Sequence, residues 1–408
     1  MNAPLECIIQ KYEKSTVDWK IRTPPPAPHR QNLRRKKGMS GKRSVIFREQ
    51  DFKETGKRDF MNQLMELEME GLVKVKWYQY GIEAEKAWYS LEQMETIYQR
   101  LGKIPKFKRI NKLKEEVDQQ LALIQSQWIR SYYQSFLQSL DKGDVPKALD
   151  TPKRELLFTC FKAIDCLQEP VYKRIFSKKY LGKSKAFEKH LQSKVLSAAR
   201  AYLDTVNDDM DDRQVLDQLM INGYAQELAV KGNLIIELAG NKINLSLFPS
   251  GFVFNNQTLR SASIPPEQSI SKVITVENKA NYESMPYEEG TLIIYSHGYF
   301  SPDERAFLIQ LERVLSGIHT SCGTAYLHTG DLDYGGVKIF QYIKKRIFPK
   351  LYPYLMDTQT YDQYMAYGEP IETSKLEKLQ RTAEPLLQPL IDKICAEKQV
   401  IEQESFLF

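Results

Sequence analysis

The sequence is most informative at His328-Thr329-Gly330-Asp331-Leu332-Asp333-Tyr334-Gly335-Gly336. The apolar run 324–327 precedes this stretch and predicts a buried strand. Two aspartates in alternate positions leave a strand end on the same side, and the glycine pair lets the chain turn tightly into a helix. Upstream, the strand-like run 272–276 ends in Glu277. Neighbouring parallel strands would bring three carboxylates to one edge, an oxygen-rich site of the kind that Mg²⁺ prefers.

Strands and helices alternate around this stretch. The pattern predicts a hairpin at 234–238 and 243–247, strands at 273–276, 292–295, 326–327 and 350–356, and helices at 303–315 and 336–347, with a closing helical region at 372–400. Strands separated by helices of this length indicate a parallel sheet, and such sheets form their sites at the carboxyl ends of the strands.

The N-terminal region is strongly basic. Residues 1–60 contain fifteen Lys and Arg against seven Asp and Glu, although the whole chain carries only +6. An amphipathic helix within residues 1–20 and a proline-rich segment at 24–28 precede most of these charges. A basic segment of this kind is suited to a polyanion. The predicted DNA-binding residues here are Arg34, Arg35, Lys36, Lys37, Lys42 and Arg43.

The fold class is therefore expected to be mixed α/β and multidomain. We expect four regions: the N-terminal helix with its proline-rich and basic arm at 1–58, a winged-helix-like α+β module at 59–105, a helical region at 106–230, and an α/β domain at 231–408. The module shows a helix at 60–70, two strands at 72–78 and 87–90, and a further helix to Leu101, a pattern that many small α+β units share. The acidic segment 207–212 is predicted to be a solvated loop with helix N-cap residues, since its spacing is not that of a calcium loop.

The sequence argues against a membrane-spanning protein and against a secreted one. No apolar run approaches the eighteen residues of a membrane span, and no signal peptide is evident. The five cysteines are scattered without a CxxC pair, which favours free thiols in a reducing compartment. We therefore expect a cytoplasmic protein without a membrane partner.

The order of the candidate site residues resembles the Toprim pattern: a strand followed by Glu277, a strand followed by Gly298, and a strand followed by Asp331 and Asp333. The stretches 276–282, 295–299 and 330–336 resemble more closely the C-terminal domain of the JetD family, the nuclease subunits of Wadjet plasmid-defence systems. JetD is similar in turn to the A subunit of topoisomerase VI, which joins a winged-helix domain to a Toprim domain.

The resemblance implies a dimeric endonuclease that cuts closed circular double-stranded DNA with Mg²⁺, or alternatively Mn²⁺. Its partners would be an SMC-like ATPase, a kleisin and a kite-type subunit. From the residues themselves, Asp331 and Asp333 are expected to hold the metal, and Glu277 is either a third ligand or the general base. Further candidates are Lys279 and His297 as catalytic residues, and Lys338 as a DNA contact beside a helix N-terminus.

Two alternatives stay open. A topoisomerase VI-like transesterase would attack DNA with a tyrosine, and Tyr132 and Tyr133 faintly resemble the tyrosines of that family. They lie in a long helical pattern, which favours packing over catalysis. A non-catalytic DNA-binding adaptor would instead use the carboxylates only structurally.

Overall fold

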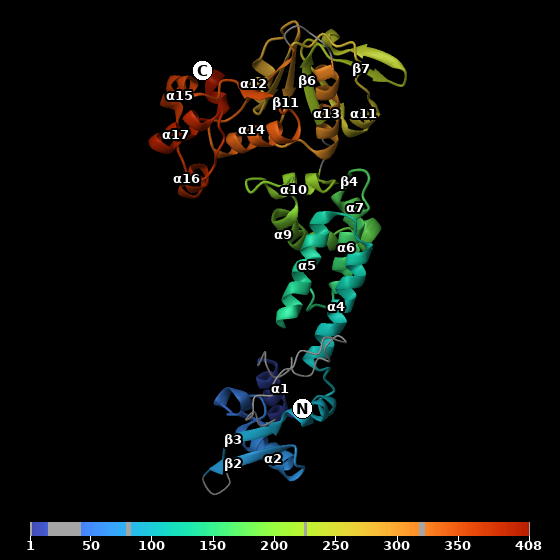
Figure 1. Cartoon of the computed structure of the whole chain (residues 1–408), viewed down its shortest axis with the longest axis vertical. Helices are drawn as coiled ribbons and strands as arrows, with labels where there is room; N and C mark the ends of the chain where they lie inside the picture. The colour runs from blue at the N-terminus through green and yellow to red at the C-terminus, as the bar shows by residue number, and fades with distance from the viewer. Residues whose placement is uncertain (1, 15–41, 79–82, 224–226, 318–322, 408) are drawn as a thin grey trace, which may run out of the picture. The chain divides into compact units, whose positions relative to one another are not determined.

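The computed structural model describes residues 2–14, 42–78, 83–223, 227–317 and 323–407 (Figure 1). The chain forms two compact units, one of Met1–Gln125 with Arg130–Arg154 and the other of Ser126–Ile129 with Glu155–Phe408. The basic residues predicted at 34–37 and the proline-rich segment lie outside the described residues. The predicted four-part division therefore stays a prediction.

The first unit combines a small antiparallel sheet with helices. Its elements are α1 (Ala3–Lys14), β1 (Lys42–Val45), η2 (Glu49–Phe52), α2 (Lys57–Met69), β2 (Val73–Tyr78), β3 (Glu83–Ser90), η4 (Leu91–Gln93), α3 (Met94–Arg100), α4 (Lys106–Leu123) and most of α5 (Gln127–Lys142).

The predicted helix and two strands of the small module are confirmed as α2, β2 and β3. The sheet has a third strand, because β1 pairs with β3 on the side opposite β2. Phe60 of α2 is fully buried and its ring meets those of Phe47 and Phe52 edge-on. Glu68 fixes α2 to β2, since its carboxylate accepts hydrogen bonds from the Val75 backbone and the Trp77 indole, both at 2.7 Å.

The second unit begins with helices and continues as an α/β domain. Its elements are α6 (Arg154–Asp165), β4 (Val171–Tyr172), α7 (Lys173–Leu181), α8 (Ala186–His190), α9 (Gln192–Tyr202), α10 (Asp212–Gln218), β5 (Ile221–Asn222), β6 (Glu227–Gly232), β7 (Ile235–Leu238), β8 (Asn241–Asn244), η5 (Leu245–Leu247), β9 (Phe252–Asn255), α11 (Asn256–Ser261), β10 (Lys272–Val276), α12 (Lys279–Ser284), β11 (Thr291–Tyr295), α13 (Pro302–Gly317), β12 (Ala325–Thr329), α14 (Tyr334–Arg346), β13 (Leu351–Pro353), α15 (Thr358–Tyr364), η6 (Met365–Tyr367), β14 (Glu369–Pro370), α16 (Thr373–Gln380), α17 (Gln388–Glu397), β15 (Gln399–Val400) and η7 (Gln403–Leu407).

The main sheet has the strand order β13-β12-β10-β11-β6-β9, and Figure 1 shows helices around it. The four strands β10 to β13 run parallel, as the sequence predicted. The sheet as a whole is mixed, because β6 pairs antiparallel with β11 and β9 pairs antiparallel with β6; neither strand was predicted from the sequence. The predicted hairpin is confirmed as β7 and β8, and it pairs outside this sheet.

The central strands are buried on both faces, which explains their continuous apolar sequences. Ile274, Val276 and Ile293 pack with Tyr282 of α12 into one core cluster. Lys231 of β6, only 4% exposed, reaches the carboxyl end of α12 and donates hydrogen bonds to three of its backbone oxygens at 2.8–3.1 Å. A buried lysine thus caps the helix that follows the first site strand.

No helix among the described residues is long and apolar enough to cross a membrane.

The packing of β6 against β11 gives the first testable prediction. Gly232 ends β6 with φ +128°, and a Cβ there would lie 2.0 Å from the backbone oxygen of Thr291. We expect Gly232→Ala to lower the free energy of unfolding by about 2–4 kcal/mol, from backbone strain and the displaced strand. Urea denaturation measures this loss.

Gly240 provides a matched control. It also has a positive φ, +77°, but a Cβ added there would meet no heavy atom within 4 Å. Gly240→Ala should therefore cost only the conformational strain, about 1 kcal/mol. Equal losses in the two variants would contradict the proposed steric cause.

Candidate metal centre

The carboxyl ends of the parallel strands bring the predicted carboxylates together. Val276 of β10 lies opposite Thr329 of β12, so Glu277 and the Asp-x-Asp stretch leave the same edge of the sheet. The backbone N–H of Asp331 donates a hydrogen bond to Glu277 Oε2 at 3.2 Å. The structure thus brings Glu277 and Asp331 into contact across adjacent strands.

Two glycines give the chain room at this edge. A Cβ on Gly330 would lie 2.3 Å from Glu277 Oε2, and a Cβ on Gly336 would lie 2.1 Å from the Asp331 backbone oxygen. Real Cβ atoms do not approach other atoms this closely. Gly336 is therefore required because it faces backbone, whereas a side chain at position 330 would displace the Glu277 carboxylate. The sequence pattern indicated only that the glycines turn the chain. The room that Gly330 leaves for the Glu277 carboxylate was not predicted.

Asp333 has a structural task as well as a predicted catalytic one. It is the N-cap of α14, and its Oδ1 accepts a hydrogen bond from the Gly336 backbone N–H at 2.8 Å. An N-cap aspartate satisfies one of the otherwise unpaired N–H groups of a helix start. The cap also holds the carboxylate in place at the sheet edge.

The C-terminal segment folds back onto this edge. Leu332 and Ile401 pair as an isolated antiparallel bridge. Gln403, which is 1% exposed, donates its backbone N–H to Asp331 Oδ1 at 2.7 Å and its side-chain amide to Thr329 Oγ1 at 3.0 Å. It also accepts hydrogen bonds from the Asn278 backbone and the Asn281 side chain. The segment is therefore fixed to both strand ends.

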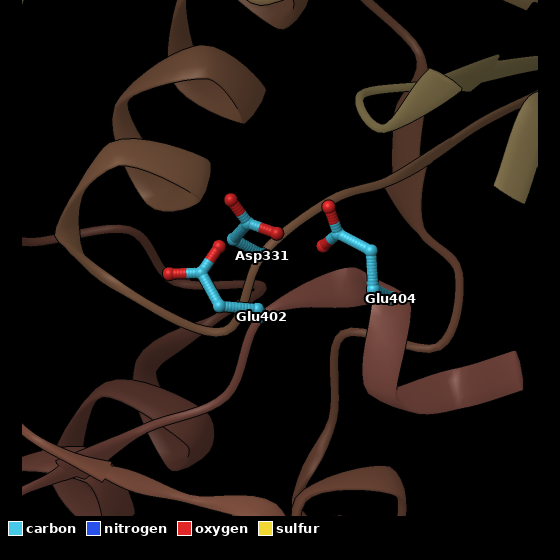
Figure 2. Close-up of side chains that lie close together, drawn as sticks. All are labelled: Asp331, Glu402 and Glu404. Atoms are coloured by element: carbon cyan, nitrogen blue, oxygen red, sulfur yellow. The ribbon is translucent and has the colours of Figure 1, made fainter. Parts of the chain in front are cut away.

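This attachment places two further carboxylates beside Asp331. Carboxylate oxygens of Asp331, Glu402 and Glu404 lie within 4.8 Å of one another (Figure 2). Neither glutamate was predicted from the sequence. The available signal was Glu402-Gln403-Glu404, which repeats the alternate-position spacing of Asp331 and Asp333.

Burial, and then the charges of neighbouring carboxylates, raise the pKa values of Glu277, Asp331 and Glu402. The pKa of Glu277 is raised well above its ordinary value, mainly by burial and then by the charges of Asp331 and Asp333. Burial raises the pKa of Asp331 to about 7, against the opposing hydrogen bond from Gln403, and Glu402 adds to the rise. The pKa of Glu402 is raised by burial and by Asp333. All-oxygen, like-charged groups of this kind are suited to a hard divalent cation.

The other predicted catalytic residues lie at a neighbouring cavity of about 440 Å³, whose lining includes Lys279, Tyr295, His297 and Tyr299. Lys279 is exposed and starts α12. His297 Nε2 lies 3.0 Å from the buried Glu304 carboxylate. Burial lowers the pKa of His297, but the charge of Glu304 and the hydrogen bond to it, with smaller contributions, together outweigh this effect, so the net pKa is raised. The lining of this cavity thus includes Arg213 as well as Lys279 and His297, and it also includes the carboxylates of Asp211, Asp217 and Glu227.

The residues predicted to contact DNA are not part of the acidic centre. Lys338 of α14 lies in a cavity of about 610 Å³ together with Lys344, Lys345 and Arg346. Lys344 contacts Glu384 at 2.7 Å and Arg346 contacts Asp204 at 3.0 Å. Lys42 and Arg43 lie on β1 of the first unit. Arg34, Arg35, Lys36 and Lys37 lie outside the described residues.

The acidic segment 207–212 differs in part from the prediction. Asp211 caps α10 as expected, accepting from Gln214 N at 2.7 Å. Asp208 and Asp209 are not simply solvated, since they accept hydrogen bonds from the hydroxyls of Tyr334 and Tyr299. The aspartates have partners in the α/β domain that lie far away in the sequence, so local composition gave no indication of these contacts.

The tyrosines of the alternative mechanism lie on α5. Tyr133 is fully buried, and the rings of Tyr132 and Tyr133 both pack against Phe136. This geometry agrees with packing aromatics.

The fold and the site together define an α/β domain that carries a cluster of carboxylates at the carboxyl ends of its parallel strands. Residues 230–408 match the family model described as Wadjet protein JetD, C-terminal. The chain is also 29% identical over 359 residues to Wadjet protein JetD of Bacillus cereus (strain Q1), which covers 86% of each protein. The chain is therefore similar to Wadjet protein JetD over most of its length, and most clearly in its C-terminal domain. All five carboxylates of the centre lie within the matched residues.

The raised pKa of Asp331 predicts a pH-dependent stability in metal-free buffer. The folded pKa of about 7 exceeds the unfolded value of about 3.9, so the folded state retains a proton that the unfolded state releases. This group's contribution to the free energy of unfolding therefore falls between about pH 4 and 7. Asp331→Asn removes the charge, and we expect it to raise Tm at pH 8 by about 2–4 °C per kcal/mol of relieved repulsion.

Thermal unfolding of both proteins in EDTA tests this prediction. At pH 4.5 most of the difference should disappear, because Asp331 is then largely protonated in the wild type. A Tm difference that is equal at pH 4.5 and pH 8 would contradict the assignment of the raised pKa.

Proposed function

We propose that the chain is the nuclease subunit of a Wadjet plasmid-defence complex, a Mg²⁺-dependent endonuclease that cuts closed circular DNA in the cytoplasm. The observation that carries the proposal is the meeting of Glu277, Asp331 and Asp333 at one sheet edge within the part that matches JetD. The Toprim assignment of this domain belongs to the proposal. So do homodimerisation and the SMC-like ATPase, kleisin and kite-type partners.

In this proposal the residues divide the work. Asp331 and Asp333 offer carboxylate oxygens to Mg²⁺ or Mn²⁺, and Glu277 is a third ligand or the general base. The cation would supply charge neutralisation at a phosphate oxygen and activation of a water nucleophile. His297, whose pKa is raised, and Lys279 provide positive charge in the neighbouring cavity for the DNA backbone.

Asp333→Asn is the sharpest test because asparagine is also a good N-cap. The variant keeps an acceptor for the Gly336 N–H and loses only the charge. Even groups that merely support metal ligands contribute about 10–100-fold, so we expect loss of this ligand to lower plasmid cleavage by more than about 100-fold. DNA binding should be unchanged. Nicking and linearisation of plasmid by the reconstituted complex measure the rate.

Asp357 gives a matched control. It caps α15 in the same way, with Oδ1 accepting from Thr360 N at 2.7 Å, and it is not part of the acidic centre. A complex that contains the Asp357→Asn variant should cut circular DNA at the wild-type rate. Full activity in Asp333→Asn, Asp331→Asn and Glu277→Gln would favour the non-catalytic adaptor. A denaturation-resistant protein–DNA adduct that is lost in Tyr132→Phe or Tyr133→Phe would instead favour the tyrosine transesterase.

The basic cavity of α14 is proposed as a phosphate-backbone contact. Lys344 and Arg346 already contact carboxylates, so Lys338 and Lys345 are the more informative pair. Replacing both with alanine should weaken binding to all DNA sequences equally and reduce the salt dependence of binding, with a slope lower by about one for each lost contact. Fluorescence anisotropy across a salt series measures this.

Lys242 of the β7–β8 hairpin, paired with Glu267, serves as the control. Lys242→Ala also removes a positive charge, but it should leave the slope of DNA affinity against salt concentration unchanged. The same slope in the Lys338/Lys345 double variant and the wild type would rule out this contact.

A further inference from the structure

The helices α7 and α8 of the second unit carry much of the positive charge of the chain. Residues 173–190, which form both helices and the turn between them, contain seven Lys and Arg against a single acidic residue, Glu188. Their net charge of +6 equals that of the whole chain. Six of the basic residues are exposed, and we call them the basic surface: Arg174, Lys178, Lys179, Lys183, Lys185 and Lys189.

The acidic residue of this segment is already paired. The Glu188 carboxylate lies 3.0 Å from the ammonium group of Lys173. This hydrogen bond lowers the pKa of Glu188, and the positive charges of Arg174 and Lys185 lower it further. Among the residues that the structure describes, no carboxylate lies within ion-pair distance of the three C-terminal members of the basic surface, Lys183, Lys185 and Lys189.

The spacing of these charges along the helices makes them repel one another. Arg174 and Lys178 are four residues apart on α7, and Lys189 lies one turn after Lys185, which begins α8. Like charges four residues apart are neighbours on a helix surface and destabilise the helix. A polyanion that lies on this surface would replace the repulsion with attraction.

The backbone beneath the basic surface is held in one arrangement. Ser177 is fully buried, and its hydroxyl accepts a hydrogen bond from the Phe187 backbone N–H at 3.0 Å and donates one to the Lys183 backbone oxygen at 2.5 Å. The rings of Phe176 and Phe187, both fully buried, meet edge-on at 5.4 Å. Gly182, with φ +78°, ends α7 and begins the turn. The exposed lysines of the turn and of α8 therefore extend from a fixed support.

The same support is joined to the α/β domain. β4, which leads directly into α7, pairs in parallel with β5, the strand that follows α10 (Figure 1). Gln218 of α10 is buried and donates its side-chain amide to the Phe300 backbone oxygen at 3.0 Å. The Gln218 side-chain oxygen accepts a hydrogen bond from Arg305 of α13 at 2.9 Å. The basic surface and the acidic centre thus belong to one compact unit.

We propose that the basic surface of α7 and α8 binds the phosphate backbone of duplex DNA without regard to base sequence, and so holds the duplex on the unit that carries the acidic centre. Duplex DNA presents about one negative charge per 1.7 Å of its axis, which suits a dense group of exposed cations with no carboxylates between them. Contacts of Lys and Arg with phosphates fix the position of a duplex and read no sequence. The inference rests on the proposed nuclease only in choosing DNA as the polyanion.

Fluorescence anisotropy of a labelled duplex with the full chain tests this, in EDTA to prevent metal-dependent cleavage. The triple variant Lys183→Ala/Lys185→Ala/Lys189→Ala should bind more than about tenfold more weakly at 0.1 M salt, because three phosphate contacts are lost. The slope of log affinity against log salt concentration should fall by about three. The Tm of the variant should equal or exceed that of the wild type, because repulsion is relieved. Replacing the same three lysines with arginine keeps the charge and should keep the binding.

A second triple variant, Lys242→Ala/Lys272→Ala/Lys393→Ala, is the matched control. Each of these lysines forms an ion pair with a carboxylate and lies outside α7 and α8, so this variant should bind DNA as the wild type does.

The outcomes separate this inference from the proposed function. Unchanged affinity and slope in the first triple variant, or an equal loss in the control, overturns the DNA contact of the basic surface and leaves the nuclease intact. Normal DNA binding with loss of assembly into the complex assigns the surface to an acidic protein partner and also overturns the contact. A chain that binds DNA through the basic surface and cuts no plasmid in the reconstituted complex overturns the nuclease and supports the contact.

Discussion

The hydrogen bond from the Asp331 backbone to the Glu277 carboxylate is the interaction on which the centre depends. It joins the ends of β10 and β12 and holds Glu277 beside Asp331. Burial, and then the charges of neighbouring carboxylates, raise the pKa values of both groups. Gly330 permits it, because any side chain there would occupy the position of the Glu277 oxygen. The requirement for glycine thus follows from the requirement for close carboxylates.

The described elements around the centre hold the repelling carboxylates in place by fixing the backbone. Asp333 is held by capping α14, and Gln403 is held by both strand ends. The buried Lys231 caps α12 from the carboxyl side and fixes the helix that follows Glu277. Its ammonium group is directed at backbone oxygens. The acidic centre therefore keeps a net negative charge that a bound cation can satisfy.

Much of the α/β domain could be predicted because its strands and helices are indicated by patterns within short stretches of sequence. The continuous apolar runs of β10 and β11 indicate strands buried on both faces, and parallel order then sets Glu277 and Asp331 at one edge. The antiparallel β6 and β9 were missed, since their sequences lack an equally clear pattern. Glu402 was missed for another reason: its partner Asp331 is distant in the chain, and the bridge between Leu332 and Ile401 brings them together with the hydrogen bonds of Gln403.

The C-terminal segment also differs in kind from the strand ends. Glu277 and Asp331 are positioned by the sheet, which is the core of the domain, whereas Glu402 and Glu404 are positioned by one buried glutamine and one isolated bridge. Gln403 nevertheless joins this segment to both strand ends through hydrogen bonds to Asn278 and Thr329, and the ring of Phe406 packs against Tyr364. The position of the two glutamates therefore depends on the same sheet edge that positions Glu277 and Asp331.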